Sequence, residues 1–357
     1  MPKPSVPIDA DSLVAYNNVA AGHEGVLSDA SGALVIKPCT QAEVSFYESA
    51  AAEHPAFAQY MPTFMGTLTR ATSSATATAN GTAVAESGDR LHGKPLDTDL
   101  HIVMEDVAAG FTKPNILDVK LGARLWDDDA PAAKRARLDD VAARSTSGSL
   151  GFRIAGMKVW GRGPKVEKGG KEKVKDEVLK EGEKKADMWE YDEDSGYTKY
   201  TKFYGRNFIT ENVADGFREY IGMPCRTRAD AEDNEQERAQ ELLSYFTGEL
   251  RGIQEALENE ESRMYSASIL FVYEGDPEAY EATKAKLAAE VEDGIDEEMD
   301  DEYDDDEELG PKLAAVKLID FAHARWTPGK GRDENALQGV RSMAKVLEDL
   351  LDGLGTA

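Results

Sequence analysis

An acid and a base occupy alternate positions in the apolar stretch 114–122, which reads Pro-Asn-Ile-Leu-Asp-Val-Lys-Leu-Gly. Its four apolar residues predict a short buried strand, so Asp118 and Lys120 project from the same face of that strand. Removing an unpaired charge from water is costly, which favours a ligand-binding role for the pair. A surface ion pair on an edge strand is the alternative that this stretch leaves open.

Four further stretches accompany this one in the order that a known family shows. Residues 114, 118, 120 and 122 match the Pro-x-x-x-Asp-x-Lys-x-Gly motif of the inositol polyphosphate kinases. The chain therefore resembles that family, and its further matches are the stretches 151–160, 204–206, 265–275 and 318–323. Within the family, the motif residues look most like those of the multikinases, of the fungal type.

A lysine ends the apolar stretch 33–37, and a helix is expected to start soon after it. Thr40 and Glu43 have the spacing of a capping box, in which each side chain binds the backbone N–H of the other residue. The resemblance to kinase small lobes implies that Lys37 holds the α- and β-phosphates of ATP and pairs with a helix glutamate. Glu43 is the expected partner of this lysine, and Glu48 is the alternative.

An aspartate follows the apolar stretch 314–319, which predicts another buried strand. The resemblance implies that Asp320 binds Mg²⁺, because kinases place a metal-binding aspartate directly after such a strand. Outside this family context, an aspartate that merely ends a core strand is the alternative. His323 is expected to orient Asp320 or to contact a substrate phosphate, with a packed histidine as the alternative.

The strand predicted at 100–104 runs into the residues that the resemblance assigns to the hinge between two lobes. Glu105 and Val107 are expected to read the adenine edge of ATP through backbone C=O and N–H groups. Because backbone atoms carry this role, the side chains here say little about it.

Transfer of a phosphoryl group needs alignment and neutralisation of negative charge rather than a covalent nucleophile. Lys120 is therefore expected to lie between donor and acceptor. Asp118 is expected to hydrogen-bond either a ribose or an inositol hydroxyl, and the sequence does not choose between them. Together with Asp320, these are the predicted catalytic residues, and ATP and Mg²⁺ are the predicted cofactors.

The basic segment 123–149 corresponds to the family's wall for the inositol phosphate. Lys134 and Arg137 share one face of a predicted short helix, so both are expected to bind substrate. A solvated basic face is the alternative. Ser268 is a further expected substrate contact, although Ala267 replaces the serine that usually precedes it in the family.

The formal net charge of −27 would by itself argue against a polyanionic ligand. Thirteen of the seventeen residues 292–308 are Asp or Glu, however, so this run alone supplies nearly half of the excess. Residues 113–158 hold nine Lys or Arg against six Asp or Glu, and a polyphosphate can be drawn there. The acidic run is predicted to be disordered, either a solubilising loop or a docking tail for basic protein partners.

Two cysteines, Cys39 and Cys225, cannot form a disulfide framework. No signal peptide is recognisable, and no apolar run approaches the roughly 18 residues of a membrane span. We therefore expect an intracellular protein, nuclear and cytoplasmic, without a membrane span. A monomer that does not bind nucleic acid directly is the default expectation.

The pattern predicts an α+β, two-lobed kinase-like fold, of the ATP-grasp or protein-kinase-like kind, with antiparallel sheets and the inserted inositol-phosphate-binding segment. The N-terminal lobe is predicted at 1–106, with a mobile insertion at about 70–90, and the C-terminal lobe at 107–357, with a charged loop at 161–195. Within the second lobe we expect strands at 154–160, 196–204 and 264–273, a long core-facing helix in 226–260, and a last helix capped by Asp333.

The expected activity is ATP-dependent phosphorylation of inositol tris- and tetrakisphosphates. An inositol hexakisphosphate kinase of the same family is one alternative, and a transcription-linked scaffold that uses its acidic run is another. A chain that had lost catalysis should lack one of Lys37, Asp118, Lys120 or Asp320, and all four are present. The sequence therefore favours an active enzyme.

Overall fold

Two antiparallel sheets, one small and one large, form the frame of the part of the chain that the structure describes. The structure is a computed structural model, and it describes residues 13–20, 25–69, 98–161, 188–223, 233–293 and 311–355. The predicted insertion at about 70–90, most of the charged loop 161–195, Cys225 and all but the first two residues of the acidic run lie outside these ranges. The α+β, two-lobed architecture predicted from the sequence is confirmed.

The small sheet has five strands in the order β1-β2-β3-β5-β4. They are β1 (Val14–Ala15), β2 (Leu27–Ser28), β3 (Leu34–Pro38), β5 (Leu100–Glu105) and β4 (Phe64–Thr69). β2 and β3 form a hairpin, whose turn is closed by Asp29, because its carboxylate accepts from the amides of Ser31 and Leu34. The hairpin delivers Lys37 to the end of β3.

Helix α1 (Gln41–Glu53) follows directly and packs on the small sheet. Thr40 caps it as predicted, since its hydroxyl accepts from the amide of Glu43 at 3.2 Å. The reciprocal half of the capping box is wrong, because the carboxylate of Glu43 binds Lys37 instead. Val44, Phe46, Tyr47 and Ala50 of this helix are buried, whereas Ala51 is exposed.

The large sheet has six strands in the order β12-β11-β6-β7-β9-β8. They are β12 (Ala314–Ile319), β11 (Ser268–Glu274), β6 (Pro114–Leu121), β7 (Phe152–Trp160), β9 (Tyr197–Tyr200) and β8 (Trp189–Asp192). β6, which carries the acid and base of the motif, has hydrogen-bonded neighbours on both sides and is buried along almost its whole length. The edge-strand alternative for Asp118 and Lys120 is therefore wrong.

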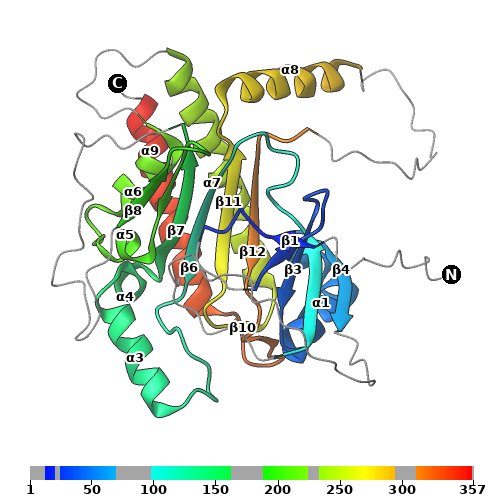
Figure 1. Ribbon diagram of the computed structural model, residues 1–357. Helices are drawn as coiled ribbons and strands as arrows, with labels where there is room; N and C mark the ends of the chain where they lie inside the picture. Colours follow the sequence, from blue (N-terminus) through cyan, green and yellow to red (C-terminus); the bar gives the residue numbers. More distant parts are fainter. Residues whose placement is uncertain are drawn as a thin grey trace.

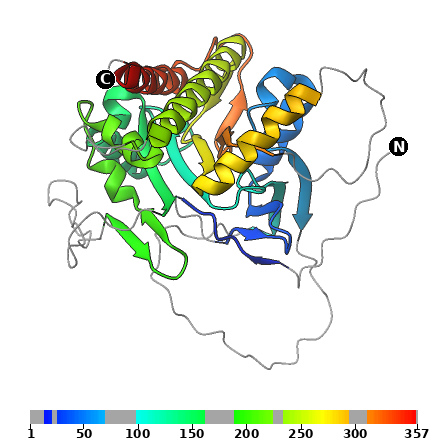
Figure 2. The ribbon, with the colours of Figure 1, turned by 90° about the horizontal axis from the view of Figure 1, so that it is seen from above.

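Two long helices, α7 (Asp233–Asn259) and α9 (Glu334–Gly355), run side by side against the large sheet (Figure 2). The predicted helix in 226–260 faces the core, because α7 buries the apolar residues Leu242, Leu243, Phe246, Leu250, Ile253 and Leu257. Asp333 caps α9 as predicted, since its carboxylate accepts from the amides of Asn335 and Ala336. The remaining helices are α2 (Pro55–Ala58), α3 (Ala132–Ala143), α4 (Thr146–Leu150), α5 (Lys202–Arg206), α6 (Val213–Ile221) and α8 (Pro277–Asp293).

Three sequence predictions for the second lobe need correction. The strand predicted at 196–204 ends at Tyr200, because Thr201 caps the short helix α5. Part of the predicted charged loop is strand β8, which pairs with β9. The strand predicted at 264–273 is two strands, because Ser266 adopts a left-handed φ of 60° between β10 (Ser262–Met264) and β11. β10 pairs with β13 (Ala324–Trp326) instead of extending the large sheet.

An aromatic cluster joins the two lobes beside the end of β12. Phe321 is fully buried, and its ring lies 5.0 Å from that of Phe46 on α1, which in turn stacks on Trp326 of β13 at 4.6 Å. Figure 1 shows the small sheet and α1 beside the strands β11 and β12 of the large sheet. No helix among the described residues is long and apolar enough to cross a membrane.

Candidate active site

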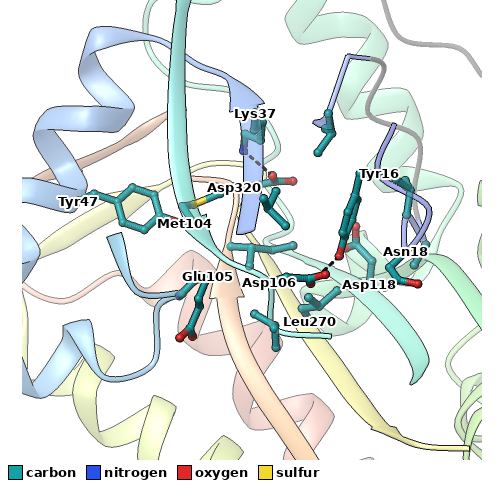
Figure 3. Close-up of a pocket in the computed structure, with 17 residues that line it drawn as sticks. Tyr16, Asn18, Lys37, Tyr47, Met104, Glu105, Asp106, Asp118, Leu270 and Asp320 are labelled. Atoms are coloured by element: carbon teal, nitrogen blue, oxygen red, sulfur yellow. Dashed lines mark hydrogen bonds and ion pairs between the residues drawn. The ribbon is translucent and has the colours of Figure 1, made fainter. Parts of the chain in front are cut away.

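A cleft between the two sheets is lined by five of the residues that the sequence singled out, namely Lys37, Glu105, Val107, Asp118 and Asp320 (Figure 3). It encloses about 700 Å³, including space that is open to solvent. The small sheet and α1 contribute Val35, Lys37, Tyr47, Met104 and Glu105, and the large sheet and the residue after it contribute Asp118, Leu270, Ile319 and Asp320. The walls are mainly apolar, and the charged residues among them are Lys37, Glu105, Asp106, Asp118 and Asp320.

Lys37 reaches this cleft from the end of β3 and is held between two carboxylates. Its Nζ donates to Glu43 Oε1 at 2.9 Å and to Asp320 Oδ1 at 3.1 Å. Burial alone would lower the pKa of Lys37, but the charges of Asp320 and Glu43 outweigh burial and raise this pKa above its usual range. The ammonium therefore stays charged at any ordinary pH. Glu48, the alternative partner, is exposed.

Asp320 stands directly after β12, as predicted, and joins the two lysines of the cleft. Its Oδ1 accepts from Lys37, and its Oδ2 accepts from Lys120 Nζ at 3.3 Å. The backbone at Asp320 has a φ of 68°, a left-handed conformation that aspartate tolerates better than most residues. Phe321, buried in the aromatic cluster, fixes the chain immediately beyond this turn.

Asp118 of the motif lines the cleft, and Lys120 is connected to the cleft through Asp320. Lys120 takes its ion pair with Asp320, two hundred residues further along the chain. Asp118 is 3% exposed and lies near the buried guanidinium of Arg153 on β7. Burial lowers the pKa of Arg153 to about 10, the charge of Arg206 lowers it as well, and Asp118 opposes both.

The predicted metal ligand fits a cation that arrives with a nucleotide. The described residues contain no cluster of three or more His, Cys, Asp or Glu side chains able to hold a metal by themselves. Mg²⁺ in phosphotransferases is held by one or two carboxylates together with substrate phosphates and water. Asp320, with its side chain 12% exposed at the cleft, supplies one such carboxylate.

The predicted hinge residues, Glu105 and Val107, both line the cleft. The amide of Glu105 donates to Thr63 O at 3.0 Å, so an adenine contact from this residue can involve only its carbonyl. Its side chain accepts from the Thr63 hydroxyl at 2.8 Å. The carbonyl of Val107 accepts from Lys312 Nζ at 3.1 Å, which holds the hinge against the segment before β12.

The predicted substrate residues lie on elements that extend from the lysine end of β6. Lys134 and Arg137 are on helix α3, as predicted, and Figure 1 shows α3 projecting from that end of the large sheet. His323 pairs with Asp127, with 2.6 Å between Nδ1 and Oδ2, and its side chain is 42% exposed. It therefore contacts the segment that precedes α3 and is not packed in the core.

Ser268 is the one predicted contact that does not fit its position. It pairs with Lys120 across β6 and β11, so it is on the same face of the large sheet as that lysine. It is nevertheless 0% exposed, because neighbouring side chains cover it. The prediction that Ser268 contacts the substrate directly is therefore contradicted by its burial. Ser268 lies buried beside its cross-strand neighbour Lys120.

Comparison with known proteins agrees with this geometry. A family profile described as "Inositol polyphosphate kinase" matches residues 101–348. The inositol polyphosphate multikinase of Saccharomyces cerevisiae is 33% identical over 92% of this chain and 95% of its own length. That of Schizosaccharomyces pombe is 27% identical over 93% and 96%. The chain belongs to the inositol polyphosphate kinase family.

A solved structure supports the same assignment. The crystal structure of the inositol phosphate multikinase from S. cerevisiae, in complex with ADP and Mn²⁺, superposes with a TM-score of 0.61 at 31% identity. It covers 90% of this chain and all of that chain. Mouse inositol hexakisphosphate kinase 3 is more distant, at 26% identity over 71% of this chain and 51% of its own length.

The structure of this inositol polyphosphate kinase also shows cleft residues that the sequence reasoning missed. Tyr16 and Asn18 line the cleft from a strap at residues 13–20, and Asp106 lies beside them at the hinge. Their neighbour Lys158 is buried within β7. The sequence did contain a signal for Lys158, because it is a lone lysine in the apolar stretch 157–160. Nothing local marked the strap.

Proposed function

We propose that this protein transfers the γ-phosphoryl group of ATP to inositol tris- and tetrakisphosphates. The observation that carries the proposal is the carboxylate of Asp320, held between Lys37 and Lys120 in a cleft between two sheets. Three charged groups that lie far apart in sequence thus meet at one point. The arrangement suits a terminal phosphate, whose charge must be neutralised while donor and acceptor are aligned.

The nucleotide would occupy the cleft with its base at the hinge and its phosphates at the lysine end. Lys37, fixed by Glu43, would hold the α- and β-phosphates. Asp320 would hold a divalent cation, proposed to be Mg²⁺, which would offset the negative charge of the nucleotide phosphates. Lys120 would then contact the transferring group, because its stem rises from the central strand of the large sheet.

The acceptor would enter from the side of α3. Lys134 and Arg137 on this helix, together with His323, are proposed to bind the phosphates of the inositol that are not being transferred. Asp118 is deeper in the cleft and lines the same cavity as the strap and the hinge. This position favours a hydroxyl of the nucleotide ribose as its partner over an inositol hydroxyl.

The preference for tris- and tetrakisphosphates over the hexakisphosphate rests on the two fungal multikinases, which match this chain over nearly its whole length. The hexakisphosphate kinases match a smaller share of it. The docking role of the acidic run and the monomeric state stay proposals. The nuclear and cytoplasmic location is also a proposal, and fluorescence microscopy of a tagged chain would test it.

The deciding experiment is incubation of the purified protein with Mg-ATP and a panel of inositol phosphates carrying three to six phosphates, followed by chromatographic separation of the product isomers. We expect phosphorylation of tris- and tetrakisphosphates. Lys120→Met is the control, because it removes the charge and keeps most of the side-chain volume. Turnover of hexakisphosphate alone would replace the proposed substrate range, and no turnover of any member would favour the scaffold.

A further inference from the structure

A strap of the chain before the small sheet closes the hinge end of the cleft. Residues 13–20 include β1, and Tyr16, Asn18 and the two residues after Asn18 line the cavity. The amide of Tyr16 donates to Val26 O at 3.2 Å, which attaches one side of the strap to the small sheet. The strap is thus a wall of the cleft with few backbone bonds of its own.

Buried polar contacts tie this strap to the hinge. The hydroxyl of Tyr16 donates to Asp106 Oδ1 at 2.8 Å, and Figure 3 shows the ring of Tyr16 pointing toward that carboxylate. The amide of Ala108 donates to the same oxygen at 2.9 Å. Burial raises the pKa of Asp106, and the hydrogen bonds from Ala108, Tyr16 and Asn18 oppose that rise. Asp106 therefore gathers donors from both the hinge and the strap.

Lys158 holds the other side of the strap from within the large sheet. Its Nζ donates to Asn17 O at 3.1 Å and to Asn18 Oδ1 at 3.0 Å, and it lies 4.1 Å from the centre of the Tyr197 ring. Because an ammonium can only donate, it fixes the amide of Asn18 with its oxygen toward Lys158. The NH₂ group of Asn18 is then turned toward Asp106, in agreement with their hydrogen bond.

Burying a lysine at this position costs free energy of folding. Lys158 is 6% exposed in β7, one of the two central strands of the large sheet, where an apolar side chain would pack without losing hydration. The groups that face it are Asp106 from the hinge, Asp192 from β8, and Lys199 and Lys113, which repel it. Burial and these two lysines lower the pKa of Lys158 to about 8 in spite of the two carboxylates. Packing alone does not explain why this strand carries a cation.

We propose that Lys158 is a positioning residue for the nucleotide, which acts by holding the strap so that Tyr16 and Asn18 stay against the hinge. The inference rests on the proposed function, because the cleft must bind ATP for the strap to matter. A wall that is ordered before the nucleotide arrives spares the cost of ordering it on binding. Lys158 therefore affects nucleotide affinity and leaves the phosphoryl transfer itself to the lysine end of the cleft.

The test is a kinetic comparison of Lys158→Met with the wild type, using Mg-ATP and an inositol phosphate that the wild type phosphorylates. Losing hydrogen bonds to a charged group costs about 1.4 kcal/mol, and that free energy corresponds to a tenfold change in affinity. We therefore expect the KM for ATP to rise by about tenfold. The kcat and the KM for the inositol phosphate should stay within about twofold of the wild type. Lys199→Met is the matched control, because Lys199 is the exposed register partner of Lys158 on β9. This variant removes a charge that repels Lys158 and leaves the hydrogen bonds from Lys158 to the strap in place.

A second variant on the strap keeps the test independent of how well Lys158→Met folds. Tyr16→Phe removes the hydroxyl donated to Asp106 and leaves Lys158 in place, and it too should raise the KM for ATP selectively. Because both residues act through one strap, the double variant should show less than the product of the two single effects. Binding of Mg-ADP, measured by titration calorimetry, should weaken in parallel with the KM for ATP.

The outcomes separate this inference from the proposed function. If the wild type neither binds Mg-ADP nor phosphorylates any inositol phosphate, the proposed function fails. If the wild type is active but Lys158→Met and Tyr16→Phe both keep its KM for ATP, only the role of the strap is overturned. A fall in kcat with both KM values raised equally would make Lys158 a structural residue and would also overturn the inference.

Discussion

Replacing Asp320 tests both the charge and the backbone conformation at the centre of the cleft. Asp320→Asn keeps the shape of the side chain and removes its charge, and asparagine also tolerates the left-handed φ of 68°. Asp320→Ala removes the charge and places an ordinary residue in that strained conformation. Backbone strain should therefore make Asp320→Ala less stable than Asp320→Asn. Loss of the charge should lower the activity of both variants.

The expected loss of stability follows from the two ion pairs of Asp320. At N–O distances of 3.1 and 3.3 Å, each pair amounts to roughly 5 kcal/mol of attraction at an effective dielectric constant of about 20, before desolvation is subtracted. Removing one partner of a buried pair costs about 3–5 kcal/mol net. Because the Asp320 side chain keeps 12% exposure and asparagine can still accept one hydrogen bond, we expect about 2–3 kcal/mol for Asp320→Asn. Asp320→Ala should lose about 1 kcal/mol more through backbone strain.

Urea unfolding followed by tryptophan fluorescence measures the stability term, and a coupled assay of ADP release measures kcat. Both variants should fall below about a thousandth of wild-type kcat, because each removes the carboxylate proposed to hold the cation. If Asp320→Asn keeps more than about a tenth of wild-type kcat, Asp320 does not hold the cation. If Asp320→Ala is as stable as Asp320→Asn, the strain argument is wrong.

Three further predictions follow from the same contacts. Lys120→Met should lower kcat by about a hundredfold or more while changing the KM for ATP far less, because the transferring group is the part of ATP that the lysine is proposed to contact; a large change in KM alone would contradict this. Glu43→Gln should raise the KM for ATP by about tenfold through loss of the partner that fixes Lys37, whereas the exposed Glu48→Gln should change neither kinetic constant. For Lys158, whose pKa is lowered to about 8, the unfolded chain binds more protons between about pH 8 and 10.5, so this residue makes the folded state more stable as pH rises through that window. Urea unfolding at pH 7 and pH 10 should therefore show the wild type gaining stability relative to Lys158→Met, and a constant difference would contradict it.

Local signals in the sequence were enough for the elements that carry the site. The hydroxyl of Thr40 starts α1 where the capping spacing predicted, because a cap depends on atoms only three residues apart. The apolar stretches before Lys37 and Asp320 form strands for a similar reason. Successive side chains of a strand point to opposite faces, so the pattern depends on consecutive residues only. Asp118 and Lys120 consequently share a face of β6.

Tertiary structure decided which of these residues interact. Lys120 pairs with Asp320, which lies two hundred residues further along the chain, and Glu43 rather than Glu48 meets Lys37. Ser268 has the register that places it beneath Lys120, yet its burial depends on the side chains that cover it. None of these choices is visible along the chain, because each is set by which strands lie side by side.

The sequence by itself determined the strands, the caps and the residue types that handle phosphate, together with the family to which they belong. The strap of Tyr16 and Asn18 and its anchor Lys158 emerged only from the fold. The reason is that a hydrogen bond between residues about 140 positions apart leaves no periodic pattern in either segment. Strands and helix caps depend on residues that are close together in the sequence. The walls of the cleft depend on how the two sheets pack, which brings distant residues together.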